Sequence, residues 1–260
     1  NTAYYRWGFY IDFRPDKEPD TFTTVSGKEI LVDEGKGPKP FEIKGVDLGA
    51  GIPGHFATEY AIDKETYLRW FRMIQDMGAN TIRVYTILSS DFYEAVYEYN
   101  RDNPEPLYII HGVWVNDYIQ NSHVDAFDDS FLKTFKEDCR TLVDIIHGRK
   151  KMNLGYSTSN ASGSYTKDIS RWVLGYIMGV EWEDVTVAYT DHMRRENSSY
   201  RGEYMYTTED ATPFEAMLAE AGDRSLCMRV KNIKNSAWWH FPTGLQRTPW
   251  TIRRRSTSCL

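Results

Sequence analysis

The stretch GYIMGVEWED, residues 175–184, places three carboxylates around a tryptophan at the end of an apolar run. The run is typical of a buried strand, and strands covered on both faces occur in parallel sheets flanked by helices. Acids at the carboxyl end of such a strand lie where α/β barrels hold their catalytic groups. Glycoside hydrolysis needs one carboxyl group to protonate the leaving oxygen and a second to act as nucleophile or base. Glu181, the first acid after the run, is therefore the leading candidate for chemistry.

Polar and aromatic side chains also follow the other predicted strands. They are Asp47 after the first, Arg83 and Tyr85 after the second, Trp114, Asn116 and Asp117 after the third, and Trp182 after the fourth. An arginine can hold a carboxylate in its ionised form, and an aromatic ring offers a flat apolar face to a sugar. Each residue has a structural interpretation as well, because a single arginine often pairs with a buried acid and tryptophans often belong to the core. Glu183 and Asp184 are interpreted as solvated loop acids. As a set, these residues favour a sugar site in which Asp47, Tyr85, Trp114, Asn116 and Trp182 contact the substrate.

A metal site is the alternative use of the polar residues near the third strand. His111, Asp117, His123 and Asp125 could be drawn as a cluster, but no histidine pair has the helical i, i+4 spacing of a metal-binding helix. The cysteines Cys139, Cys227 and Cys259 have no metal spacing either. The segment GAGIPG after the first strand lacks the spacing of a nucleotide-binding loop. We expect neither a metal nor another cofactor.

Four predicted strands alternate with helices and must position these residues. The strands cover residues 41–49, 80–87, 107–115 and 172–181, and the helices cover 63–78, 89–100, 130–147 and 212–222. Such alternation predicts an α/β fold with a parallel sheet in which consecutive strands lie side by side. We expect a partial (β/α)8 TIM barrel of about four to five βα units, with a doubly wound sheet as the alternative. Strands over residues 4–13 and 21–32 form a short β segment in front of it.

The charge is unevenly distributed along the chain. The net charge is −6, which disfavours a nucleic-acid partner, and no run of about 18 apolar residues predicts a membrane span. Residues 227–260 hold seven basic residues and no acid, so residues 1–226 carry 24 basic against 37 acidic residues, a net of −13. We therefore divide the chain into an N-terminal β segment (1–37), a partial TIM-barrel catalytic domain (38–226) and an aberrant basic tail (227–260). Reading from the third base of the Cys227 codon can restore acids and an apolar strand, which favours a reading-frame error as the origin of the tail.

Three segments resemble the retaining (β/α)8 glycoside hydrolase clan, which includes β-galactosidases, cellulases and glucanosyltransferases. GPKPFEIKGVDLG resembles the opening of that barrel, MGANTIRVY its second strand and LGYIMGVEWE its fourth strand. The resemblance covers residues 38–226 and is closest to large bacterial barrel-type glycoside hydrolases. It implies that Glu181 is the general acid/base and that Arg83 gives electrostatic support to the nucleophile. The clan usually has asparagine before the acid/base, where this chain has Val180.

The resemblance implies a fragment of a retaining glycoside hydrolase or transglycosidase acting on a β-linked polysaccharide or oligosaccharide. It places the nucleophile on a seventh strand, outside these residues, so we expect the chain alone to be inactive. The alternative, favoured by Val180, is a non-catalytic carbohydrate-binding or scaffold protein with a degenerate barrel. For the parent protein we expect an extracellular or cell-surface location rather than a cytoplasmic one.

Overall fold

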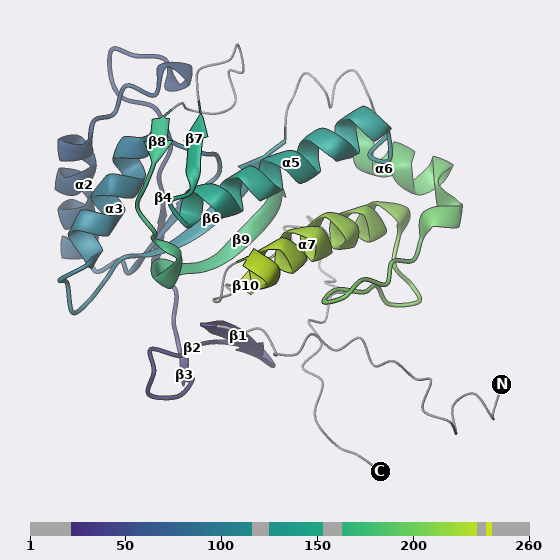
Figure 1. Cartoon of the computed structure of the whole chain (residues 1–260), viewed down its shortest axis with the longest axis horizontal. Helices are drawn as coiled ribbons and strands as arrows, with labels where there is room; N and C mark the ends of the chain where they lie inside the picture. The colour runs from purple at the N-terminus through teal and green to yellow at the C-terminus, as the bar shows by residue number, and fades with distance from the viewer. Residues whose placement is uncertain (1–21, 116–124, 153–162, 233–237, 241–260) are drawn as a thin grey trace.

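A parallel β-sheet forms the centre of the molecule. The computed structural model describes residues 22–115, 125–152, 163–232 and 238–240. The sheet has the strand order β10-β9-β6-β5-β4, and every neighbouring pair is parallel (Figure 1). Its strands are β4 (Gly45–Asp47), β5 (Thr81–Val84), β6 (Tyr108–Trp114), β9 (Val173–Val180) and β10 (Trp238–His240). The predictions of an α/β fold and of neighbouring strands in chain order are confirmed.

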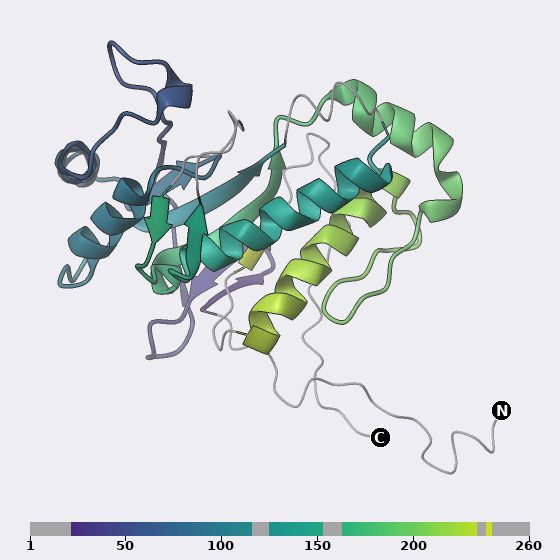
Figure 2. The same cartoon turned by 45° about the horizontal axis from the view of Figure 1, so that its top comes forward.

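Helices connect the strands, and their ends follow the capping residues in the sequence. They are α2 (Lys64–Asp76), α3 (Ser90–Asn100), α5 (Asp129–Ile146), α6 (Asp184–Met193) and α7 (Pro213–Asn232). Asp63 caps α2 by accepting a hydrogen bond from the Thr66 amide at 2.8 Å, and Gly78 follows the helix at φ +87°. At α7, the Thr212 amide donates to Glu215 while the Glu215 amide donates to the Thr212 hydroxyl, as in a capping box. In both views α5 and α7 lie side by side over the same face of β6 and β9 (Figures 1 and 2).

The N-terminal β segment is a small antiparallel sheet. The strand predicted over residues 21–32 is wrong as a single element, because it is the hairpin β1 (Thr23–Ser26) and β2 (Glu29–Val32), which turns at Gly27 with φ +61°. The predicted first barrel strand is also shorter than expected. Of the predicted residues 41–49, only Gly45–Asp47 form the strand β4; β3 (Lys39–Pro40), which lies just before them, pairs with β2, and the Phe41 amide donates to the Ile30 carbonyl. The prediction for residues 4–13 lies outside the described residues.

Three further elements differ from the prediction. Helix α7 does not end at Gly222 but continues to Asn232, because the next turn still buries Asp223, Ser225 and Leu226. The hairpin β7 (Lys150–Met152) and β8 (Gly163–Tyr165) is inserted between α5 and β9. Helix α6 begins at Asp184, which was interpreted as a loop acid, and Glu183 is its N-cap residue.

The core lies between the helices and the sheet. Every residue of β9 is buried, as the apolar run predicted. At the opposite end of the sheet from the carboxyl ends, Tyr108 at the start of β6 packs against Phe22 and Phe41 and donates a hydrogen bond to Glu34. The β segment therefore covers the amino-terminal end of the strands. Among the described helices, none is both long and apolar enough to cross a bilayer.

Candidate active site

A row of polar and aromatic side chains follows the carboxyl ends of three neighbouring strands. Asp47 of β4 is in register with Arg83 of β5, and Nη1 of Arg83 lies 3.2 Å from both carboxylate oxygens of Asp47. The Arg83 guanidinium lies 5.7 Å from the ring centroid of Tyr85, and the Tyr85 ring lies 6.4 Å from that of Trp114. Four of the residues predicted for the sugar site therefore lie together. The ion pair is open to solvent, with the Asp47 side chain 59% and the Arg83 side chain 34% exposed.

Close backbone packing holds this row in place. A Cβ atom on Gly49 would lie 2.7 Å from the Tyr85 hydroxyl, and one on Gly112 would lie 2.9 Å from the Tyr85 Cα. At Gly112 only glycine leaves room for the backbone of Tyr85, because contacts under 3.0 Å are sterically forbidden. The backbone of Tyr85 is thus packed closely against β6.

Glu181 lies at the end of the next strand and has an unusual backbone conformation. Val180 is in register with Trp114, so Glu181 directly follows the residue beside the aromatic row. Glu181 has φ +57°, and Tyr60 is the only other non-glycine residue with positive φ in the described part of the chain. The left-handed conformation costs an L-residue about 1–2 kcal/mol, and such residues cluster at functional sites. The Glu181 side chain is exposed, so the described residues do not enclose its carboxyl group.

Trp182 faces the helices rather than the row of site residues. Its ring packs at 5.1 Å from Phe135 of α5 and at 4.9 Å from Phe214 of α7, and its indole N–H donates to the Met178 carbonyl at 3.2 Å. The ring also covers Gly179, where a Cβ would lie 2.3 Å from the indole. The structure therefore does not bring Trp182 together with Arg83 and Tyr85, and its position is that of a core residue.

Val180 contributes an apolar wall to the candidate site. It is 5% exposed, and its Cγ2 atom would lie 2.8 Å from a Cβ on Gly112, the glycine that also makes room for Tyr85. A side chain at position 180 therefore faces the same side of the sheet as the aromatic row. Valine can donate no hydrogen bond to a sugar hydroxyl there.

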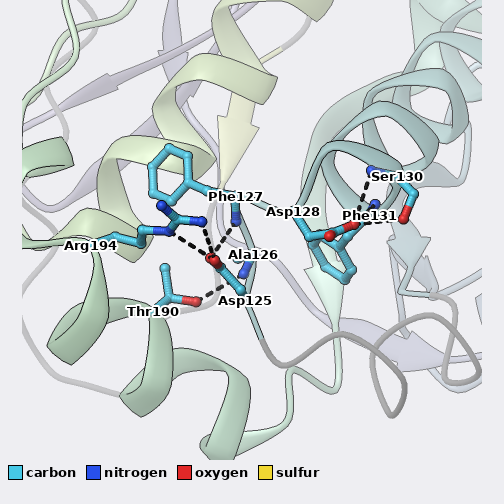
Figure 3. Close-up of polar contacts among 8 residues, drawn as sticks. All are labelled: Asp125, Ala126, Phe127, Asp128, Ser130, Phe131, Thr190 and Arg194. Atoms are coloured by element: carbon cyan, nitrogen blue, oxygen red, sulfur yellow. Dashed lines mark hydrogen bonds and ion pairs between the residues drawn. The ribbon is translucent and has the colours of Figure 1, made fainter.

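An ion pair ties two of the loops at this end of the sheet to each other. The Asp125 carboxylate accepts hydrogen bonds from Arg194 Nε at 2.8 Å and from the Phe127 amide at 2.9 Å (Figure 3). The Ala126 amide donates to the Thr190 hydroxyl at 2.9 Å. The segment that leads into α5 is thereby held against α6, which starts three residues after Glu181. Asn116 and Asp117, on the same connection, lie outside the described residues.

Two of the residues considered for a metal site, His111 and Asp125, have other partners, and Asp117 and His123 lie outside the described residues. His111 is fully buried, and its Nε2 lies 2.8 Å from the Tyr93 hydroxyl while its Nδ1 lies 2.9 Å from the Gly112 carbonyl. Burial lowers the pKa of His111 to about 4. Asp125 is occupied by Arg194. Within the described ranges, no group of three or more His, Cys, Asp or Glu side chains is arranged to hold a metal.

Two exposed aromatic residues near the strand ends were missed in the sequence. Phe56, in the connection after β4, is 78% exposed, and Tyr189 on α6 is 40% exposed between Val185 and Met193 at successive helical turns. The i, i+4, i+8 spacing of these three residues is a helical pattern that the sequence contains. It was overlooked because residues 183–184 were interpreted as a loop.

Comparison with known proteins identifies no relative of this chain. No protein-family model, no curated protein and no solved structure matches this chain. The resemblance to the glycoside hydrolase clan therefore stays a prediction that rests on the residues themselves.

Proposed function

We propose that the chain is part of a retaining glycoside hydrolase or transglycosidase that acts on a β-linked polysaccharide or oligosaccharide. Its fold would be the first half of a (β/α)8 barrel, with the remaining strands supplied by a longer parent protein. Glu181 would be the general acid/base, and Arg83, paired with Asp47, would stabilise negative charge near the nucleophile. Tyr85 and Trp114 would contact the sugar.

The observation that carries the proposal is the strained backbone of Glu181 at the end of a fully buried strand. Glycine would occupy the left-handed conformation without cost, so the glutamate side chain is held there at the expense of stability. The carboxyl ends of parallel strands are the edge at which α/β barrels hold their chemistry. The Asp47–Arg83 pair, the two rings and Glu181 all follow such ends on neighbouring strands.

Two carboxyl groups would share the reaction. Glu181 would donate a proton to the leaving oxygen and then remove a proton from the incoming water or sugar hydroxyl. The nucleophile would come from a later strand of the parent protein. We further propose that these later strands cover Glu181, because a general acid keeps its proton near neutral pH when it is shielded from water.

The second candidate function is carbohydrate binding without turnover. Val180 favours it, because this buried apolar side chain stands at the position where the resembled clan places a hydrogen-bonding asparagine. In this case the rings of Tyr85 and Trp114 would bind the sugar, and Glu181 would have no role in proton transfer.

Activity on β-glucans, measured on the complete parent protein, separates the two candidates. We expect Glu181→Gln to reduce the rate of hydrolysis of a natural glucan by several orders of magnitude, because the glutamine amide cannot transfer a proton to the leaving oxygen. Glu183→Gln is the matched control, two residues further along and also exposed, and should retain activity. Near-normal activity of Glu181→Gln would refute the assignment, and glucan binding by an inactive wild-type protein would establish the second function.

A further inference from the structure

Basic residues are concentrated around the β7–β8 hairpin in an otherwise acidic chain. Residues 147–172 contain five basic residues and one acid, a net of +4, although the whole chain has a net charge of −6. We name this set, Arg149, Lys150, Lys151, Lys167 and Arg171, the hairpin basic surface. Arg149, Lys151 and Arg171 are exposed, and Lys150 and Lys167 are half-buried.

Backbone packing and ring contacts place four of these five residues, Arg149, Lys150, Lys167 and Arg171, on adjoining segments of the chain. A Cβ on Gly148 would lie 2.7–2.8 Å from the backbone of Thr166 and Lys167, so the chain before Arg149 lies against the chain at Lys167. Lys150 is paired with Tyr165 in the hairpin. Lys167 Nζ lies 5.3 Å from the ring of Tyr97, and Arg171 Cζ lies 4.9 Å from the ring of Trp172. The two rings pack edge to face at 6.1 Å and thus link the two cations.

Two acids lie close to this surface, and neither forms an ion pair with Lys151, Lys167 or Arg171 in the described part of the chain. Asp168 is paired with His147 at 3.4 Å, and Glu34 accepts a hydrogen bond from Tyr108. In the parts of the chain that the structure describes, Lys151, Lys167 and Arg171 form no ion pair with a carboxylate. Their charges are therefore available to an external anion.

The hairpin basic surface is separate from the candidate active site. Arg171 lies two residues before the first residue of β9, whereas Glu181 directly follows its last residue. Eight strand residues at about 3.3 Å each place the two about 26 Å apart. A ligand held by the hairpin basic surface therefore contacts the protein away from the reacting centre.

We infer that the hairpin basic surface binds an anionic glycan, a chain carrying sulfate or carboxylate groups. Ser164 and Thr166 expose hydroxyl groups beside the cations, and these suit the neutral hydroxyls of a sugar chain. A bilayer is a poorer partner, because no large hydrophobic residue is exposed among the described residues 140–152 and 163–172. A nucleic acid is also a poorer partner, because Tyr165 and Trp172 are buried and offer no ring for base stacking, and the overall charge is negative.

Fluorescence anisotropy of the full chain with a labelled sulfated hexasaccharide tests the inference. We expect the triple variant Lys151→Gln/Lys167→Gln/Arg171→Gln to bind at least tenfold more weakly. The matched control Arg69→Gln/Arg72→Gln/Lys133→Gln removes three exposed cations on α2 and α5 and should stay within twofold of the wild type. Because the basic residues of 227–260 are present in every variant, they cannot produce this difference.

The single change Lys151→Glu guards against loss of the fold, because the Lys151 side chain is exposed and forms no ion pair with a carboxylate in the described part of the chain. It should weaken binding severalfold without changing the circular dichroism spectrum. Equal affinities of the triple variant and its control would overturn the inference. Tighter binding of single-stranded DNA or of phosphatidylserine vesicles than of the hexasaccharide would overturn the choice of a glycan.

Discussion

Replacing Glu181 with glycine separates the stability of the chain from the chemistry proposed for it. Glu181 is held at φ +57°, where an L-residue costs about 1–2 kcal/mol and glycine almost nothing. The greater conformational freedom of glycine in the unfolded state lowers the stability of the fold by about 0.5–1 kcal/mol, which offsets part of the strain energy that the substitution removes. We therefore expect Glu181→Gly to raise the free energy of unfolding by about 0.5–1 kcal/mol while removing the proposed acid/base. The assay is urea unfolding followed by circular dichroism.

Glu209→Gly is the matched control, because Glu209 is exposed and has an ordinary negative φ. There the substitution should lower the free energy of unfolding by about 0.5–1 kcal/mol, since no strain is relieved. A loss of more than about 1 kcal/mol in Glu181→Gly would refute the reasoning. It would mean that the glutamate side chain stabilises the fold and that its conformation is structural in origin.

Three further predictions concern other parts of the chain. Burial lowers the pKa of His111 to about 4, so the unfolded state binds more protons below pH 6.5, and the contribution of this residue to the free energy of unfolding falls by about 2 kcal/mol between pH 7 and pH 5; the difference between the wild type and His111→Gln in urea unfolding, measured at both pH values, isolates this contribution. Burial raises the pKa of Asp138 to about 7, so this carboxyl has the opposite effect and stability falls as pH rises from about 4 to 7; Asp138→Asn should therefore stabilise the chain at pH 7.5 and not at pH 4.5. Arg194→Ala should lower the free energy of unfolding, because it removes the ion pair of the mostly buried Asp125 carboxylate and leaves it with the hydrogen bond from the Phe127 amide, and a double-mutant cycle with Asp125→Ala should give a positive coupling energy.

The origin of the basic tail is tested by the gene. If a shifted reading frame is the cause, the nucleotide sequence should contain an open frame that continues from the third base of the Cys227 codon and restores acidic residues. Absence of such a frame would contradict this origin. In the structure, α7 runs to Asn232 and β10 pairs with β9, so both elements extend beyond the proposed shift point.

Much of the fold could be predicted because local signals agree with the tertiary structure. Asp63 and Gly78 delimit α2, and the apolar run of residues 173–180 forms a strand buried on both faces. The end of α7 was predicted too early because Gly222 is a stop signal only where the following residues gain nothing from continuing the helix. Here Leu226 is buried one turn later, and packing outweighs the glycine.

The candidate site was predicted in part, because strand order alone brings the strand ends together. Parallel pairing in chain order places Asp47 opposite Arg83 and puts Trp114 at the end of the neighbouring strand. The direction of Trp182 could not be predicted, since it depends on the positive φ angles of Gly179 and Glu181, which turn the chain away from the regular alternation of a strand. The ion pair between Asp125 and Arg194 joins residues 69 positions apart in the sequence, so no local sequence pattern could predict it.

Azide rescue of Glu181→Gly in the complete parent protein tests the assignment of the acid/base most directly. A dinitrophenyl β-glycoside needs no acid to leave, so the variant should form the glycosyl-enzyme and then stall, because no general base activates water. Azide needs no base, so it should restore turnover and yield a β-glycosyl azide detectable by NMR. Turnover of this substrate by the variant that is unchanged by azide, with free sugar as the only product, would contradict the role of Glu181.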